Sequence, residues 1–175
     1  MQDAPVEQIA KQVGIARGLI YRQFSSKEEL YVLTVTDYLA ELAAAMKGKD
    51  LAAMTEAFAR FCVRYPAFMD CALSIMHKPA QELRQRVSES VWLRLGDGMA
   101  SCIGPLCEAL RDRGVEDPDF TANVLWTQAL GVMHLARIQV GLRRTDGAPE
   151  LFTVATEDVV RTCVDTALRL TAPLP

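Results

Sequence analysis

The sequence predicts an all-α protein, and three observations carry that prediction. Hydrophobic residues make up 50% of the chain and aromatic residues only 7%, with alanine and leucine prominent, a balance that favours helices over sheet. Apolar residues recur with the 3.6-residue period of a helix. Glycine and proline separate these segments, and none of the breaks resembles the two-residue turn of a β-hairpin. We therefore expect helices throughout.

Two short helices are expected at the N-terminus. The first runs over about residues 5–13, with Pro5 at an early helical position, and it ends at Gly14. The second runs over about residues 16–24, and its apolar side chains four positions apart predict a buried side.

A third, long helix is expected over about residues 27–46. Ser26 and Glu29 have the spacing of a capping box, in which a hydroxyl and a carboxylate satisfy each other's backbone amides. Asp50 is the candidate cap of the next helix. The helices expected after it cover about residues 50–65, 66–79, 80–113, 119–142 and 154–170.

Two irregular features are expected among these later helices. Gly96, Gly98 and the pair Gly104-Pro105 predict kinks or a break within residues 80–113. Residues 143–150 are expected to form a polar loop, because this stretch contains Gly147 and Pro149 among charged side chains.

The segment Val6–Leu30 carries the pattern on which a functional interpretation depends. Its marks are Ile9-Ala10, Gly14, Arg17-Gly18, Tyr21, Phe24 and the run Ser26-Lys27-Glu28-Glu29-Leu30. This pattern closely resembles the helix-turn-helix signature of TetR-type transcriptional regulators. The resemblance implies a TetR-like repressor, an all-helical homodimer that binds a palindromic DNA operator and is released by a small, largely apolar effector.

The second helix of such a motif enters the major groove of DNA. The expected DNA-binding residues are Arg17, Gly18, Leu19, Tyr21, Arg22 and Lys27. Arg17 can donate a bidentate pair to guanine, and Leu19 suits an apolar contact with a thymine methyl group. Lys27, beside the free amides at the start of the third helix, suits a phosphate.

The segment also departs from the family pattern. Ala4 and Ala16 stand where relatives often carry hydroxyl residues that contact phosphate. The family has a whole helix before the motif, whereas only Met1–Ala4 precede it here, so we expect this sequence to be a shortened version of the protein. The alternative is a ligand-binding or dimerising helical protein that no longer binds DNA.

The resemblance divides the chain into a DNA-binding region, residues 1–46, and an effector-binding and dimerisation domain, residues 47–175. It implies that the last two helices pair across a two-fold axis, for which the last helix offers the face Val160, Cys163, Val164, Ala167 and Leu168. The expected ligand-binding residues are Phe61, Trp92, Met99, Asn123, Trp126, Thr127 and His134. Hydrogen bonding inside the core or across the dimer accounts equally well for the polar members of this set.

Several other classes of function find no support in the sequence. The net charge is −3, so any DNA contact must be local. The motifs of hydrolases, zinc proteases and phosphate-binding loops are missing, and we expect no enzyme, no cofactor and no metal. The five cysteines form no CxxC pair and are expected as buried thiols. No long apolar run suggests a membrane span, and we expect a cytoplasmic protein.

Overall fold

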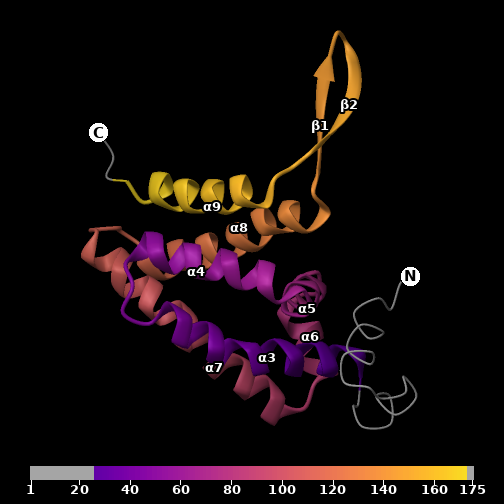
Figure 1. The fold of residues 1–175 in the computed structure, drawn as a ribbon. Helices are drawn as coiled ribbons and strands as arrows, with labels where there is room; N and C mark the ends of the chain where they lie inside the picture. The colour runs from indigo at the N-terminus through magenta and orange to yellow at the C-terminus, as the bar shows by residue number, and fades with distance from the viewer. Residues whose placement is uncertain (1–25, 173–175) are drawn as a thin grey trace. The chain divides into compact units, whose positions relative to one another are not determined.

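The structure is a computed structural model that describes residues 26–172 of the chain (Figure 1). Its helices are α3 (Lys27–Met46), α4 (Leu51–Arg64), α5 (Pro66–Met76), α6 (Ala80–Arg86), α7 (Glu89–Asp112), α8 (Pro118–Ile138) and α9 (Thr156–Leu170), and its strands are β1 (Val140–Thr145) and β2 (Ala148–Thr153). The expected all-α class is confirmed, with the two strands as a minor addition. The two short helices expected before residue 25 lie outside the described residues.

Side-chain caps fix the starts of three helices, and two of these caps were predicted. The backbone N–H of Glu29 donates to Ser26 Oγ over 3.0 Å at the start of α3. The N–H of Ala53 donates to Asp50 Oδ1 over 2.8 Å at the start of α4. Asp117 serves α8 in the same way, 3.0 Å from the N–H of Phe120. Each cap satisfies an amide that the helix leaves without a partner.

The long helix expected over residues 80–113 is divided, but not where glycine and proline predict. It is broken between α6 and α7, where Val87 is extended (φ −125°, ψ 154°), and the N–H of Ser88 donates to Glu29 Oε1 over 3.1 Å. Of the kinks or break expected at Gly96, Gly98 and Gly104-Pro105, a break is wrong, because α7 continues through Pro105. A tertiary hydrogen bond, rather than local propensity, accompanies the observed break.

The described residues fall into two compact units, which are considered separately. The first comprises residues 26–41 and Tyr65–Ser101, and its core gathers Val32, Leu83 and Val91. Gly98 brings α7 close to α3, because a Cβ there would lie 2.8 Å from Leu39 Cδ1. A larger residue at this position would require the Leu39 side chain or the helices to shift.

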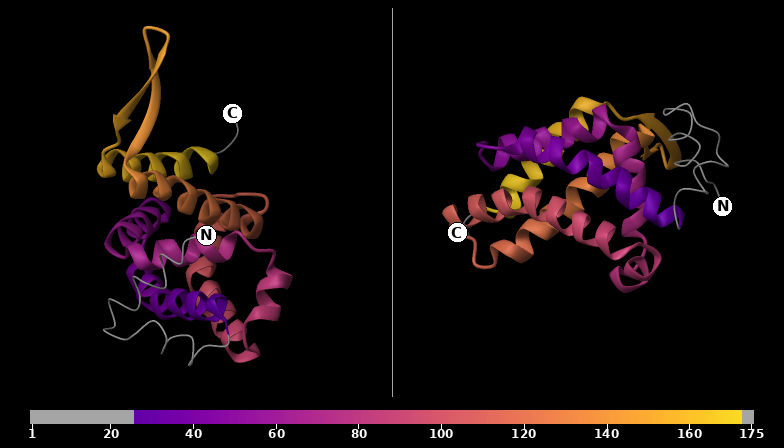
Figure 2. Two further views of the ribbon diagram at one scale, coloured as in Figure 1. Left: turned by 90° about the vertical axis from the view of Figure 1, so that its right-hand side faces the viewer. Right: turned by 90° about the horizontal axis from the view of Figure 1, so that it is seen from below.

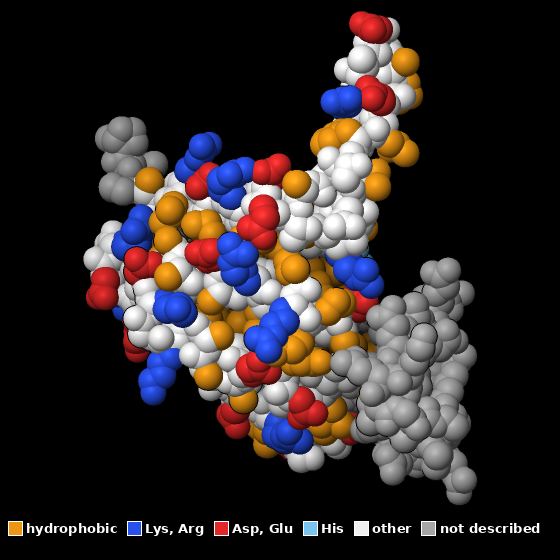
Figure 3. Space-filling view, in the orientation of Figure 1, with side chains coloured by type: hydrophobic (Ala, Val, Ile, Leu, Met, Phe, Trp, Pro, Cys, Tyr) orange, Lys and Arg blue, Asp and Glu red, His pale blue; other side chains and the backbone are white. Residues whose placement is uncertain are grey.

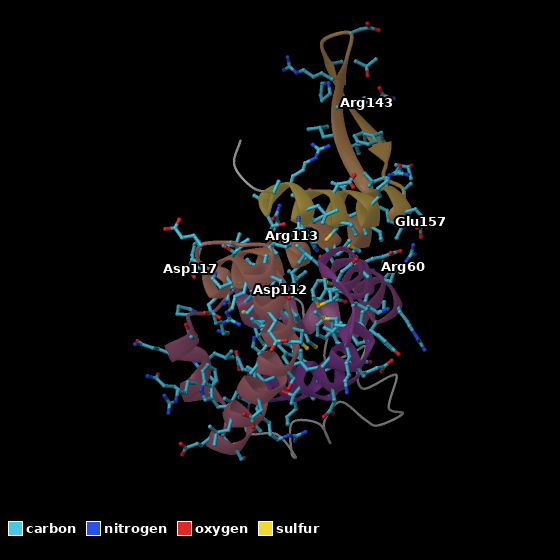
Figure 4. The ribbon with its side chains drawn as sticks, turned by 90° about the vertical axis from the view of Figure 1, so that its left-hand side faces the viewer. Arg60, Asp112, Arg113, Asp117, Arg143 and Glu157 are labelled. Carbon is cyan, nitrogen blue, oxygen red and sulfur yellow. The ribbon has the colours of Figure 1, made fainter. Side chains whose placement is uncertain are left out.

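The second unit comprises Leu42–Arg64 and residues 102–172, and its core lies between α4, α8 and α9. Phe58 of α4 packs on Trp126 of α8 with ring centroids 4.8 Å apart. Arg60 of α4 and Glu157 of α9 form an ion pair of 3.3 Å at the surface of this unit (Figure 4). Within residues 26–172, no helix has both the length and the apolar character needed to cross a bilayer.

A β-hairpin replaces the polar loop expected at residues 143–150, and that expectation is wrong. Strands β1 and β2 pair in antiparallel register from Val140 opposite Thr153 to Thr145 opposite Ala148. The turn residues Asp146 and Gly147 both have positive φ, 53° and 83°. Positive φ at both central residues is the mark of a type I′ turn, which Asp-Gly favours. This dipeptide was therefore the hairpin signal in the sequence.

Candidate functional site

The start of α3 is the first place where predicted site residues can be located. Lys27 is the first residue of this helix and is exposed, so its ammonium group is accessible beside the helix N-terminus. Arg17, Gly18, Leu19, Tyr21 and Arg22 lie outside the described residues. Their contacts with DNA therefore stay predictions, and Lys27 is the predicted DNA-binding residue that lies within the described part of the chain.

Polar contacts within the first unit hold the start of α3 in place. Ser26 Oγ donates to the carbonyl of Arg86 over 2.5 Å. Glu28 and Glu29 are only 5% and 8% exposed, and Glu28 Oε1 lies 3.6 Å from Lys78 Nζ. Buried carboxylates need such partners. The first turn of α3 is thus tied to the segments on both sides of α6.

Lys78 is the cation of this cluster. Its ammonium group lies 3.0 Å from Glu82 Oε1, and the hydrogen bond with Glu82, assisted by Glu28, raises the pKa of Lys78. The same hydrogen bond lowers the pKa of Glu82. Lys78 therefore remains charged at neutral pH and bridges the buried carboxylate of Glu28 and the partly exposed carboxylate of Glu82.

A small apolar cavity lies in the second unit, among α4, α8 and α9. Its lining residues include Met54, Phe58, Leu125, Trp126, Cys163 and Ala167, together with Met46 at the end of α3. The cavity volume is about 20 Å³, enough for about one water molecule. Burial raises the pKa of the Cys163 thiol to about 11, so this side chain is neutral in the cavity wall.

Gln128 of α8 also lines this cavity, and it carries an unusual polar atom. Its Oε1 is buried and has no hydrogen-bond partner. Among the side-chain nitrogen and oxygen atoms of residues 26–172, it is the one buried atom without such a partner. Leaving such an acceptor unsatisfied costs about 1–3 kcal/mol. A ligand or water that donates a hydrogen bond here would recover that free energy.

Two hydroxyl groups in the same lining can assist. Thr55 Oγ1 donates to the carbonyl of Leu51 over 2.8 Å, and Thr166 Oγ1 donates to that of Thr162 over 2.7 Å. Since both protons are engaged, these oxygens present lone pairs. Donor groups on an otherwise apolar molecule therefore match the polar atoms of the cavity.

The predicted ligand-binding residues lie in several places. Trp126 lines the cavity and is 8% exposed, while Phe61 is buried on α4 without being one of its lining residues. The polar stripe of Asn123, Thr127 and His134 is exposed on α8. Trp92 and Met99 belong to the first unit and are partly buried. As a ligand-binding set these residues stay a prediction.

Sequence reasoning missed Gln128, Thr55 and Thr166. A signal for Gln128 was present, because it follows the apolar Leu125 by three positions and so shares its side of the helix. The two threonines carry a comparable signal, because Thr55 follows Leu51 by four positions and Thr166 follows Cys163 by three.

The outer face of α8 is more apolar than a solvent-exposed helix needs. Its exposed large hydrophobic side chains are Phe120 (67%), Val124 (38%), Leu135 (37%) and Ile138 (50%). They recur at helical spacing with Thr127 and Gly131 between them. Such an apolar stripe, open to solvent in one chain, is typical of an interaction surface.

The face of α9 expected at a subunit interface has a different role. Val160, Cys163 and Ala167 are 3–4% exposed, because α9 packs on α4 and α8 of its own unit. These three side chains belong to the core, and the expectation that they meet a partner is wrong. Val164 and Leu168 remain partly exposed.

The helical fold and the sequence of the N-terminal motif can both be compared with known proteins. Residues 1–33 match the family model of bacterial regulatory proteins of the tetR family. The fold is similar to that of a TetR family transcriptional regulator, PfmR, from Thermus thermophilus, with a TM-score of 0.58 and 21% identity over 94% of this chain and 87% of that one. No curated protein matches the chain.

The match of residues 1–33 shows that the N-terminal segment is similar to the DNA-binding region of tetR-type regulators. The similarity to PfmR over most of the chain is a similarity of fold, and that fold is all-α.

Proposed function

We propose that the chain is a ligand-responsive repressor that binds a palindromic operator as a homodimer and is released by a small, largely apolar effector. The observation that carries the proposal is the family match over residues 1–33, which contain Arg17, Tyr21 and Arg22. The same proposal makes the chain a binding protein rather than an enzyme. A dimerising protein that does not bind DNA is the second candidate, and DNA binding by the intact chain separates the two.

In this proposal the recognition helix lies in the major groove. Arg17 and Arg22 read base edges or phosphates, Gly18 permits close approach, Leu19 contacts a thymine methyl group and Tyr21 contacts the backbone. Lys27, exposed at the first position of α3, binds a phosphate near the helix N-terminus. With a net charge of −3, the chain depends on these local cations to approach DNA.

Helix α3 supplies the connection between effector and head. It is one continuous helix of 20 residues, about 30 Å long at 1.5 Å per residue. Met46 at its end lines the cavity, and Lys27 stands at its beginning. In this proposal an effector that widens the cavity displaces Met46, and α3 carries that displacement toward the DNA-binding head. The coupling is reciprocal, so operator DNA weakens effector binding by the same factor.

The exposed stripe of α8 is the proposed subunit interface. Phe120, Val124 and Ile138 give it apolar area, and the small Gly131 permits two helices to approach closely. Since two copies related by a two-fold axis present the same stripe to each other, one self-complementary surface suffices. Burying these side chains removes the exposed apolar area from water.

Replacing Gln128 with leucine tests whether the apolar cavity among α4, α8 and α9 holds an unsatisfied hydrogen-bond acceptor. Gln128→Leu is expected to raise the free energy of unfolding by about 1 kcal/mol or more, because an unpaired buried oxygen is lost. Urea unfolding measures the change, with Gln81→Leu on an exposed position of α6 as the matched control. A loss of stability in Gln128→Leu would mean that this oxygen is satisfied in solution.

A further inference from the structure

The β-hairpin has little packing from the rest of its chain. Its strands pair with each other, and no helix has extensive contact with either strand in the described residues. The hairpin stands away from α8 and α9, the helices that it connects, in Figure 1 and in the left-hand view of Figure 2. A two-stranded hairpin alone is at best marginally stable in water. This one therefore needs a surface to pack against.

One face of the hairpin is satisfied by its own side chains. Arg143 Nη2 lies 2.8 Å from Glu150 Oε1, and Thr145 Oγ1 donates to Glu150 Oε2 over 2.5 Å. The Arg143 guanidinium also lies over the ring of Phe152, 5.7 Å from its centroid. That ring covers Gly141, where a Cβ would overlap it. This face has no need of a partner.

The opposite face is open and carries apolar side chains along most of its length, with Arg144 near the turn and Thr153 at the base. Leu142 and Leu151 lie directly across from each other in the ladder and are 69% and 70% exposed. Val140, two residues before Leu142 and on the same face, is 44% exposed. Hydrophobic side chains are visible along the hairpin in Figure 3. We call Val140, Leu142 and Leu151 the apolar face of the hairpin.

This face continues an exposed apolar surface of α8. Ile138, the last residue of α8, is 50% exposed and Leu135 is 37% exposed, and only Gln139 separates Ile138 from Val140. A six-residue strand extends about 20 Å at 3.3 Å per residue, a reach long enough to pass from one subunit onto its neighbour. The hairpin thus lengthens the surface proposed to join two subunits.

We propose that the hairpin is a dimerisation arm, whose apolar face packs on a second copy of this chain. The inference rests on the proposed homodimer through α8. By two-fold symmetry each subunit extends its arm over the other, so two arms are buried in one assembly. The Arg143–Glu150 pair then faces solvent. Leu142 and Leu151, on the other face, are removed from solvent by the second copy.

The test compares matched substitutions on the two faces of β2 in the full chain. Leu151→Glu places a charge on the apolar face, and Ala148→Glu places the same charge on the opposite face of the same strand. Val124→Glu changes the α8 stripe. Sedimentation velocity over a dilution series gives the dimer dissociation constant of each variant, and circular dichroism checks that each is folded.

Leu151→Glu is expected to raise the dimer dissociation constant about tenfold or more, because it changes a buried interface residue. Ala148→Glu is expected to change this constant by about twofold or less, because Ala148 lies outside the buried centre of the interface. Equal constants for these two variants, with Val124→Glu still weakening the dimer, would overturn the arm and leave the α8 interface standing. A wild-type chain that stays monomeric throughout the dilution series would overturn the homodimer itself.

Hydrogen exchange of the wild-type chain provides a second measurement that needs no substitution. The amides of residues 140–153 are expected to exchange more slowly above the dimer dissociation constant than below it, because the arm is ordered by the partner. Protection that is the same at all concentrations would show that the hairpin docks on its own chain. Rapid exchange at all concentrations would show that nothing covers it, and either result contradicts the proposal.

Discussion

Replacing both Arg17 and Arg22 with alanine is expected to weaken specific operator binding strongly. A bidentate arginine contact with guanine is worth about 1–3 kcal/mol of discrimination, so loss of two contacts reduces specific affinity by roughly one to four orders of magnitude at 1.4 kcal/mol per decade. Fluorescence anisotropy measures this with a labelled DNA segment from upstream of the chain's own coding sequence, at matched salt.

Two control variants separate a loss of base recognition from a general loss of affinity for DNA. Lys27→Ala, at a phosphate-binding position, is expected to weaken binding to specific and unrelated DNA alike and to reduce the salt slope by about 1. Arg84→Ala, at an exposed position of α6, is expected to bind like the wild type. Unchanged specific affinity in the Arg17→Ala/Arg22→Ala variant would exclude the proposed recognition helix.

Phe58→Ala is expected to have the largest effect on stability. Phe58 is 3% exposed and packs on Trp126 in the cavity wall. Truncating a buried phenylalanine costs about 3–5 kcal/mol, through lost burial and the space left behind. Urea unfolding measures the change, and Leu93→Ala, at a side chain that is 60% exposed, is expected to stay within about 0.5 kcal/mol of the wild type.

The enlarged cavity of Phe58→Ala provides a further readout. An apolar cavity of sufficient size takes up benzene, and a ligand that binds only the folded state raises its stability. Benzene is therefore expected to raise the Tm of Phe58→Ala and to leave that of Leu93→Ala unchanged. If Phe58→Ala lost less than about 1 kcal/mol, well below the usual range, Phe58 would not be a core residue.

The sequence was informative where the signal is local. Ser26 and Asp50 were identified as caps because a cap depends on its own residue type and on amides two or three positions away. The helical class followed from the apolar period. The break between α6 and α7 was not predicted, because Glu29, which accepts from Ser88, lies 59 positions earlier in the chain.

Other features depend on which surface a side chain meets. The apolar period of α9 indicates that Val160 and Ala167 are covered, but it cannot tell a partner subunit from α4 and α8 of the same chain. Gln128 was not identified because its significance comes from a cavity built by several helices. The hairpin was missed for another reason, since the Asp146-Gly147 signal was present and was assigned to a loop.

Footprinting on the DNA upstream of the chain's own coding sequence tests the central claim most directly, namely that this chain is a dimeric regulator that reads DNA through its N-terminal motif. The account predicts two protected blocks whose centres lie about 34–36 Å, or one helical turn, apart, with two-fold related sequences and no protection by Arg17→Ala/Arg22→Ala. Protection that survives this double substitution, or the absence of any protected site at salt concentrations where unrelated DNA is bound, would contradict it.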